Sequence, residues 1–188
     1  KMMLNGKEAL IYDNCMPDEQ FILLKTTLMG ENFPWCYNEE AVLSTTQIKS
    51  PIEGYDDNNR VPQFVHVFFR KGSYSWSPYT EAIKHVLDLI NPSAWIRVKA
   101  NLGCKATKHL VSGWHYDITD TSTNQSHTNS ITAQLYINTN NGYTLFETGD
   151  KIESVENRLV IFPCDTLHTG IATTDVSRRI LLNFNFFI

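Results

Sequence analysis

The chain of 188 residues is 42% hydrophobic and 19% charged, a balance typical of a folded globular protein rather than a disordered one. Its formal net charge of −4 lacks the basic surplus of general nucleic-acid binders, so we expect no nucleic-acid partner. No apolar run is long enough to span a membrane, so we expect no membrane partner either.

Two helices are predicted in the first half of the chain. In the first, Phe21, Leu24 and Leu28 recur at the helical period after Pro17, which suits a first helical turn, and a glycine ends the run. The second is expected over residues 77–91, where a Ser-Pro pair opens an amphipathic stretch and an Asn-Pro pair closes it.

Elsewhere the hydrophobic pattern has the two-residue period of β-strands. Segments rich in β-branched and aromatic residues are predicted as strands near 8–12, 41–48, 61–70, 94–102, 107–114, 130–138, 143–147, 158–163 and 178–187. The predicted fold class is therefore α+β and mainly β, in one domain over 1–188 with a β core over about 94–188. A sandwich or jelly roll suits such strands, because each sheet must bury one face against another layer.

The last predicted strand has two different faces. Its even positions are apolar and consist of Ile180, Leu182, Phe184 and Phe186. Its odd positions include Arg179, Asn183 and Asn185. Because side chains alternate across a strand, one face packs into a core and the other presents a cation and two amides. Buried polar groups need partners, so this pattern indicates a polar ligand inside the barrel.

The segment Gly113-Trp114-His115-Tyr116-Asp117 is the central motif of the sequence. Its histidine and aspartate are two residues apart, so on a strand both side chains point into the same cavity. Alone, this pair also fits an ordinary surface turn. His168 follows 51 residues after Asp117, just past a predicted strand and turn. Two histidines and one carboxylate form the facial triad that binds non-haem iron(II) and leaves further coordination positions open.

Arg179 lies 11 residues after His168, on the polar face of the last strand. A guanidinium there could bind a carboxylate through two parallel hydrogen bonds, as a dicarboxylate cosubstrate would require. Arg178 is the alternative, although it falls on the apolar face of the strand. Lys99 and Asn101 share a strand face and are further candidates for the cavity wall.

In combination these residues resemble the 2-oxoglutarate/Fe(II) oxygenase superfamily in its prolyl-4-hydroxylase-like branch, especially the small stand-alone members found in bacteriophage genomes. The resemblance covers about half of the chain, from Trp95 to the carboxyl end. Its motifs, in order, are His115-x-Asp117, Thr132-Ala133-Gln134-Leu135-Tyr136-Ile137-Asn138, Asn141-Gly142-Tyr143-Thr144-Leu145-Phe146, His168 and Arg179. The amino-terminal half, including Phe33-Pro34-Trp35, resembles the phage-type members more loosely.

The resemblance implies a double-stranded β-helix, a distorted jelly roll with the N-terminal helices packed on the larger sheet. It implies that His115, Asp117 and His168 bind Fe(II) and carry catalysis. Arg179 would bind 2-oxoglutarate, joined by Tyr136 and, more weakly, by Asn183. The implied reaction uses O2 to hydroxylate an unactivated C–H bond and releases succinate and CO2. The implied substrate is a peptidyl side chain of the prolyl type or a small molecule.

Two other functions fit parts of the pattern. A cupin-like metal dioxygenase that does not use 2-oxoglutarate would have no need of Arg179 or Tyr136 as carboxylate-binding groups. A non-catalytic jelly-roll module would bind its partner without any contribution from His115 or His168. These alternatives therefore differ in which of the four side chains are required.

The loop over 118–130 follows the metal ligands and is rich in Thr, Ser and Asn. It is interpreted either as a lid over the substrate or as an ordinary surface connection. The four cysteines lie far apart without metal-finger spacing, at Cys15, Cys36, Cys104 and Cys164. We therefore expect reduced thiols and a cytoplasmic protein, located in the host cytoplasm if the chain is phage-encoded.

Overall fold

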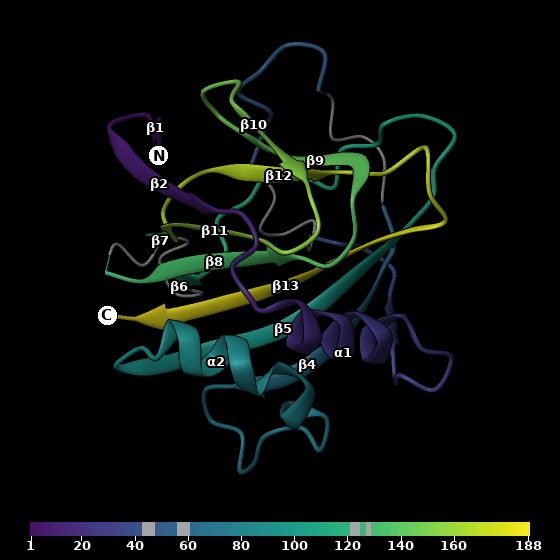
Figure 1. Cartoon of the computed structure of the whole chain (residues 1–188). Coiled ribbons are helices and arrows are strands. Elements are labelled where there is room, and N and C mark those ends of the chain that lie inside the picture. Colours follow the sequence, from purple (N-terminus) through teal and green to yellow (C-terminus); the bar gives the residue numbers. More distant parts are fainter. Residues whose placement is uncertain (43–47, 56–60, 121–124, 127–128) are drawn as a thin grey trace.

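The computed structural model describes residues 1–42, 48–55, 61–120, 125–126 and 129–188. Within these ranges the chain is mainly β, with antiparallel sheets and two α-helices (Figure 1). The helices are α1 (Asp18–Met29) and α2 (Lys84–Ile90), preceded by a 3-10 turn, η1 (Thr80–Ile83). The mainly β prediction is therefore confirmed.

The strands form one large sheet, one small sheet and a short hairpin. The large sheet has the spatial order β1 (Met2–Leu4), β2 (Lys7–Tyr12), β11 (Arg158–Pro163), β8 (Ile131–Tyr136), β13 (Arg178–Phe187), β5 (Ala94–Cys104), β4 (Gln63–Arg70) and β3 (Cys36–Asn38). The small sheet has the order β10 (Lys151–Ser154), β9 (Asn140–Phe146) and β12 (His168–Ile171). The hairpin pairs β6 (Thr119–Asp120) with β7 (Gln125–Ser126).

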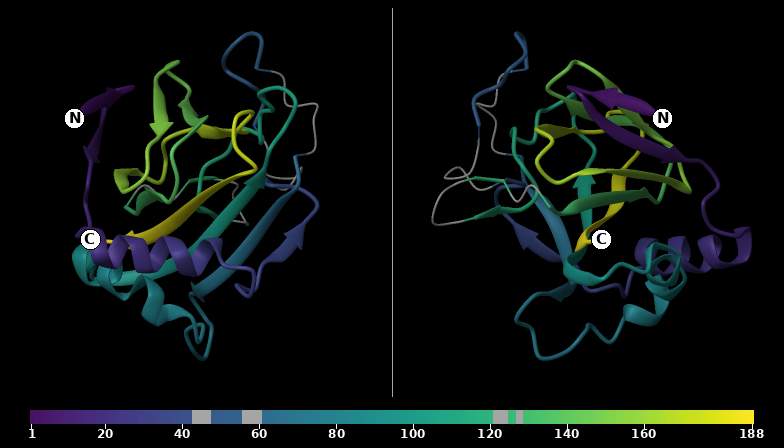
Figure 2. Two further views of the ribbon diagram at one scale, coloured as in Figure 1. Left: turned by 45° about the vertical axis from the view of Figure 1, so that its right-hand side comes forward. Right: turned by 90° about the vertical axis from the view of Figure 1, so that its left-hand side faces the viewer.

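The helices cover one face of the large sheet, and the small sheet lies on the other side (Figures 1 and 2). Leu24 and Leu28 of α1 and Val86 of α2 share a buried cluster with residues of β5, β8 and β13, including Phe184. Burial of these apolar side chains is the main force that holds the layers together. The expected packing of N-terminal helices on the larger sheet is thus observed.

The first helix follows its predicted pattern. It begins after Pro17, with Asp18 and Glu19 in the first turn, where carboxylates stabilise the helix dipole. Phe21 is buried together with the leucines that follow it at helical spacing, and the helix ends before Gly30. The sequence period therefore identified both the limits and the buried face of α1.

The second predicted helix is divided, so the expectation of one helix over 77–91 is wrong. The Ser77 hydroxyl accepts the Tyr79 amide N–H at 3.2 Å, and the Thr80 hydroxyl donates to the Ser77 carbonyl at 2.6 Å. Such local side-chain bonds compete with α-helical pairing and favour a tight 3-10 turn. The α-helical part begins only at Lys84, and Asn91 ends it with a left-handed conformation at φ 39°.

Seven of the nine predicted strands appear, as β2, β4, β5, β8, β9, β11 and β13. The strand expected over 107–114 is wrong as a regular element. It makes only isolated bridges, at Val111 and Trp114, and Gly113 interrupts it with φ 98°. The strand expected over 41–48 lies partly outside the described residues, since 43–47 are not included, while Ile48 bridges to Trp114.

Two further sequence expectations concern membranes and thiols. No helix in the described part of the chain is long and apolar enough to cross a membrane. All four cysteines are free, and Cys164 is buried beside the polar interior. The free cysteines agree with the expectation of unpaired thiols.

Candidate metal centre

The metal-ligand motif is held against the small sheet by backbone pairing. The His115 amide donates to the His168 carbonyl at 3.0 Å, and the His168 amide donates to the His115 carbonyl at 3.2 Å. These two bonds form an isolated antiparallel bridge between the 113–117 segment and β12. Side chains of directly paired residues lie on the same side of a sheet, so both imidazoles face the space between the two sheets.

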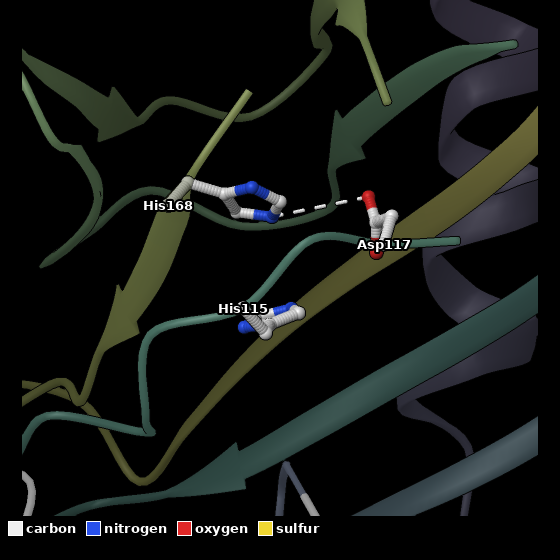
Figure 3. A group of neighbouring side chains, drawn as sticks. All are labelled: His115, Asp117 and His168. Carbon is white, nitrogen blue, oxygen red and sulfur yellow. Dashed lines mark ion pairs between the residues drawn. The ribbon is translucent and has the colours of Figure 1, made fainter. Parts of the chain in front are cut away.

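His115, Asp117 and His168 form a compact set of donor atoms. One ligand atom from each lies within 4.8 Å of the others, and no other group of this kind occurs among the described residues. Figure 3 shows the three side chains around a common space, with His168 Nε2 3.8 Å from an Asp117 oxygen. The two imidazole centroids are 4.7 Å apart. The structure thus brings together the three metal ligands named from the sequence.

Both histidines are oriented by carbonyl groups. His115 Nδ1 lies 3.0 Å from the Gly113 carbonyl, and His168 Nδ1 lies 2.9 Å from the Thr166 carbonyl. A carbonyl oxygen can only accept, so each Nδ1 carries the proton and each Nε2 keeps a free lone pair. This is the tautomer that a metal requires, because the hydrogen bond at one nitrogen fixes the ligand role of the other.

Asp117 is held by three neighbouring side chains from the large sheet. Thr132 donates to one carboxylate oxygen at 2.8 Å, and Arg97 donates to the other at 3.3 Å. Asn183 Nδ2 lies 3.2 and 3.1 Å from the two oxygens. Ligating carboxylates are normally supported in this way, since the supporting bonds fix their orientation toward the metal.

The protonation states suit metal binding at neutral pH. Burial lowers the pKa of His115 to about 3, with a further contribution from His168, so the imidazole is neutral. Burial alone would raise the pKa of Asp117, but its electrostatic interactions with His168 and the Arg97 guanidinium outweigh burial and hold the pKa below its usual value. A metal can therefore bind the neutral His115 imidazole and the ionised Asp117 carboxylate without displacing a proton from either group.

Arg179 lies in the same cavity as the metal ligands. Its Nε donates to the Ser154 hydroxyl at 2.8 Å, Nη2 lies 3.4 Å from the Thr144 hydroxyl, and the guanidinium stands 5.5 Å from the centre of the Tyr136 ring. No carboxylate in the described part of the chain forms an ion pair with it. Burial lowers the pKa of Arg179, and the group still retains its charge because the ordinary value is so high.

Gly142 makes room for this arginine. A methyl group at its Cβ position would lie 2.8 Å from Arg179 Cδ and 2.8 Å from the Ile171 carbonyl oxygen. Both distances are far shorter than van der Waals contact, so glycine is required here for the arginine to reach the cavity. The Asn141-Gly142 pair of the sequence motif thus has a direct steric role.

The other cosubstrate candidates have distinct positions. Arg178 points away from the cavity and donates to the Met29 carbonyl at 3.0 Å, so it cannot replace Arg179. The Tyr136 hydroxyl is buried 2.8 Å from Thr144 and 3.3 Å from Gln134. Its proposed contact with a cosubstrate stays a prediction. Asn183 lines the cavity, and its side-chain amide donates a hydrogen bond to Asp117. Its observed partner is therefore a predicted metal ligand.

The cavity between the sheets is lined by the three predicted metal ligands and by further polar side chains. Lys99, Asn101, Gln134 and Arg179 line its wall together with His115, Asp117 and His168. Lys99 also borders an open groove along β3, β4 and the 116–118 segment, which reaches the same metal ligands from outside. The sequence analysis did not identify Arg97 and Thr132, although each falls on the inward face of its strand.

The metal-proximal end of the cavity contains an unusual lysine. Lys99 Nζ has no hydrogen bond or ion pair with any described residue. Burial lowers the pKa of Lys99 to about 7, and the nearby charge of Arg97 adds to this effect. Asn101 Oδ1 and Asn183 Oδ1 are also buried without a hydrogen-bond partner among the described residues. Unsatisfied groups of this kind are rare in protein interiors and indicate a missing polar ligand.

The lid predicted over 118–130 is described only in part. β6 and β7 pair as a short hairpin within it, while residues 121–124 and 127–128 lie outside the described residues. Its role as a lid or a surface connection therefore stays a prediction.

No protein-family model matches the sequence, and no curated protein matches it. Solved structures do match its fold. A viral collagen prolyl hydroxylase from Paramecium bursaria Chlorella virus-1, as a 2OG complex, aligns with a TM-score of 0.56 and 16% identity over 98% of each chain. A Pseudomonas putida prolyl-4-hydroxylase aligns with a TM-score of 0.59 and 12% identity, over 97% of this chain and 94% of that one.

A prolyl hydroxylase from Trichoplax adhaerens, in complex with a peptide fragment of a hypoxia inducible factor, aligns with a TM-score of 0.61 and 11% identity. This match covers 95% of the present chain and 83% of the hydroxylase. At these identities the comparisons establish a shared fold. The resemblance to prolyl-4-hydroxylase-like 2-oxoglutarate/Fe(II) oxygenases is thereby confirmed at the level of the fold.

Proposed function

We propose that this protein is an Fe(II)- and 2-oxoglutarate-dependent dioxygenase that hydroxylates an unactivated C–H bond. The observation that carries the proposal is the presence of Arg179, without a carboxylate partner among the described residues, in the same cavity as the His115, Asp117 and His168 donor set. A half-buried cation without a counterion costs free energy, so an anionic ligand best explains the position of this arginine.

The donor set fits iron(II) in type and arrangement. Two imidazole nitrogens and one carboxylate oxygen can occupy one face of a metal and leave the opposite positions open. His115 and His168 both present Nε2, because their Nδ1 protons are engaged by carbonyl groups. The support of Asp117 by Thr132 and Asn183 further matches a ligating carboxylate.

The cavity fits 2-oxoglutarate at its distal end. The planar guanidinium of Arg179 is suited to a carboxylate, and its hydrogen bond to Ser154 fixes the direction of its remaining N–H donors. The Thr144 hydroxyl lies 3.4 Å from this arginine and donates to Gln134 Oε1 at 3.1 Å, so it belongs to the polar wall of the same subsite. Tyr136 supports the arginine through its ring, and we propose that its hydroxyl contributes to the same subsite.

The bound iron, with O2 and the oxo acid, would supply the oxidising power for C–H hydroxylation, coupled to formation of succinate and CO2. The residues of this chain hold the reactants in place. Arg179 orients the cosubstrate by its distal carboxylate, and Asp117 lowers the positive charge at the metal. The apolar contacts of the His168 ring with Phe146 and Phe162 limit access of water to that side.

The two alternative functions explain fewer of these features. A metal dioxygenase without 2-oxoglutarate has no use for Arg179, nor for the steric space that Gly142 gives it. A non-catalytic jelly-roll module has no use for two histidines held in the metal-binding tautomer. Both alternatives remain distinguishable by metal and cosubstrate binding.

We further propose a double-stranded β-helix formed by a single catalytic domain over 1–188. The arrangement of a large and a small antiparallel sheet around the cavity supports this architecture. For the substrate, we propose a peptidyl side chain of the prolyl type or a small molecule that enters along the open groove beside His115 and Asp117. No nucleic-acid or membrane partner is proposed.

Succinate formation tests the proposed activity. Protein supplied with Fe(II), ascorbate, 2-oxoglutarate and air is incubated with a panel of proline-containing peptides and free amino acids. We expect iron-dependent succinate release that rises with one substrate class, together with a product heavier by one oxygen atom. If succinate never exceeds the level formed by the His115→Ala variant with any member of the panel, the proposed activity is rejected.

A further inference from the structure

Lys99 is the second unpaired cation of the cavity. It lies on β5, directly opposite Asn183 of β13, whereas Arg179 is opposite Gly103. The two cations therefore enter the cavity from positions four residues apart along one strand pair, or about 13 Å at the backbone. Arginine and lysine side chains are long enough to approach a short ligand from both ends.

The charges of the cavity do not balance without a ligand. Its charged wall residues are Lys99, Asp117 and Arg179. Asp117 is already paired with Arg97, which donates to both its carboxylate and its backbone carbonyl. Lys99 and Arg179 are thus left without a carboxylate among the described residues, so each can bind one carboxylate of a dianionic ligand, whose negative charge also favours the charged form of Lys99.

A neighbouring amide shows that the lysine end of the cavity is polar. Asn101 follows Lys99 by two residues, on the same strand face, and lines the same cavity. Its Oδ1 is buried without a hydrogen-bond partner among the described residues. A buried acceptor of this kind needs a donor, which a carboxylate cannot supply, so Asn101 Oδ1 has room for a water molecule or hydroxyl that accompanies the ligand.

We propose that Lys99 binds the metal-proximal carboxylate of the oxo acid and so forms the second anion subsite of the cavity. This inference rests on the proposed function, which supplies the dicarboxylate. Arg179 selects the distal carboxylate, and Lys99 selects the oxo-acid end. The cosubstrate is then recognised by charge at both ends rather than at one end alone.

The same arrangement has a consequence for the empty protein. A half-buried lysine without a carboxylate partner destabilises the fold, and an apolar side chain of similar length removes that cost. The Lys99→Met apoprotein should therefore unfold at a temperature equal to or higher than the parent, although its ligand affinity is lower. A purely structural role for Lys99 would give the opposite change in stability.

Binding calorimetry on the full chain tests the proposal without relying on turnover. The protein is loaded with Mn(II), which does not support oxidation, and titrated with 2-oxoglutarate and with 2-oxobutyrate, which lacks the distal carboxylate. Lys99→Met should weaken both ligands by about tenfold or more, the loss expected for one charge-assisted hydrogen bond. Arg179→Met should weaken 2-oxoglutarate alone. Lys84→Met, on the exposed surface of α2, is the matched control and should bind both ligands like the parent.

The outcomes separate this inference from the proposed function. If Lys99→Met and Lys99→Gln bind both oxo acids within twofold of the parent while Arg179→Met still loses 2-oxoglutarate, the lysine subsite is wrong and the proposed function stands. If the parent itself binds no 2-oxoglutarate, both are wrong. Recovery of affinity in Lys99→Arg, which restores the charge, supports the subsite directly.

Discussion

His115 and His168, 53 residues apart in sequence, exchange both of their backbone hydrogen bonds, at 3.0 and 3.2 Å. This direct pairing places the two imidazoles side by side without any further element to position them. The third ligand, Asp117, follows two residues after His115 and thus faces the same side. The metal geometry is therefore set by backbone register, and the side-chain bonds to Gly113 and Thr166 then fix ring orientation.

Removal of one imidazole tests this metal site. His168→Ala should weaken iron binding by more than about 100-fold, since loss of a mere supporting partner typically costs 10- to 100-fold. Iron is measured after anaerobic dialysis against a series of Fe(II) concentrations. His85→Ala, an exposed position on α2, is the control. Equal iron content in His168→Ala and the parent would contradict the assignment of His168.

Asn183 has two candidate roles, and its variant separates them. Its amide donates to Asp117, so Asn183→Ala should loosen the metal carboxylate and weaken iron binding by about 10- to 100-fold. An effect on 2-oxoglutarate affinity at saturating metal, with iron affinity unchanged, would instead favour a direct contact with the cosubstrate. Iron titrations with and without the oxo acid supply both values.

Arg179 should govern the cosubstrate and leave the metal unaffected. Arg179→Met removes a charge-assisted pair worth about 2 kcal/mol, so 2-oxoglutarate affinity should fall by roughly 30-fold or more at unchanged iron content. Arg178→Met is a closely matched control, because the adjacent side chain binds the Met29 carbonyl outside the cavity. If the two variants lost equal affinity, the assignment to Arg179 would fail.

Gly142 tests the same subsite without touching a charge. Gly142→Ala inserts a methyl group 2.8 Å from Arg179 Cδ, so the arginine must shift away from its position. We expect weaker 2-oxoglutarate binding in calorimetry, with iron stoichiometry preserved. A thermal unfolding scan accompanies the measurement, because the methyl group also meets the Ile171 carbonyl. Parent-like oxo-acid affinity in the folded variant would show that the close approach has no functional role.

The buried histidine should make the apoprotein sensitive to acid. The pKa of His115 falls from 6.5 to about 3 on folding, because burial disfavours its charged form. Below about pH 6.5, His115 binds a proton in the unfolded chain but stays neutral in the folded chain. The free energy of unfolding therefore decreases as the pH falls toward 3. Asp117 acts in the same direction at lower pH, since its pKa is also lowered on folding.

Urea unfolding of the apoprotein at pH 7 and pH 5 measures this effect. We expect His115 to contribute a loss of about 1 to 2 kcal/mol between these two values. His115→Gln cannot titrate and should show a smaller difference than the parent, whereas His85→Gln serves as the exposed control. An identical pH difference in His115→Gln and the parent would contradict a buried, neutral imidazole.

Much of the site was predictable because it depends on local periodicity. The alternating face of β13 separates Arg179 from Arg178, and the structure gives these neighbours opposite environments. The His-x-Asp spacing likewise places two ligands on one side of the chain. Patterns of this kind follow from the geometry of an extended backbone and need no knowledge of the tertiary fold.

The remaining features depend on contacts between distant segments. The 107–114 segment has strand-like composition, but Gly113 lies at φ 98° and the segment makes only isolated bridges, from Val111 to β12 and from Trp114 to Ile48, so no regular ladder forms. The pairing of Arg97 with Asp117 and the steric space at Gly142 join residues from distant segments of the chain. No local pattern distinguishes such residues from others on the same inward face, so only the assembled sheets identify them.

An anaerobic titration of the apoprotein with Fe(II) and then 2-oxoglutarate, followed by visible absorbance, tests the central claim most directly. We predict a weak metal-to-ligand charge-transfer band that appears only with both present, is absent in His168→Ala, and requires far more 2-oxoglutarate in Arg179→Met. Bound iron without this band at saturating 2-oxoglutarate would contradict the account and favour a dioxygenase that does not use the oxo acid. Failure to bind iron at all would favour a non-catalytic module.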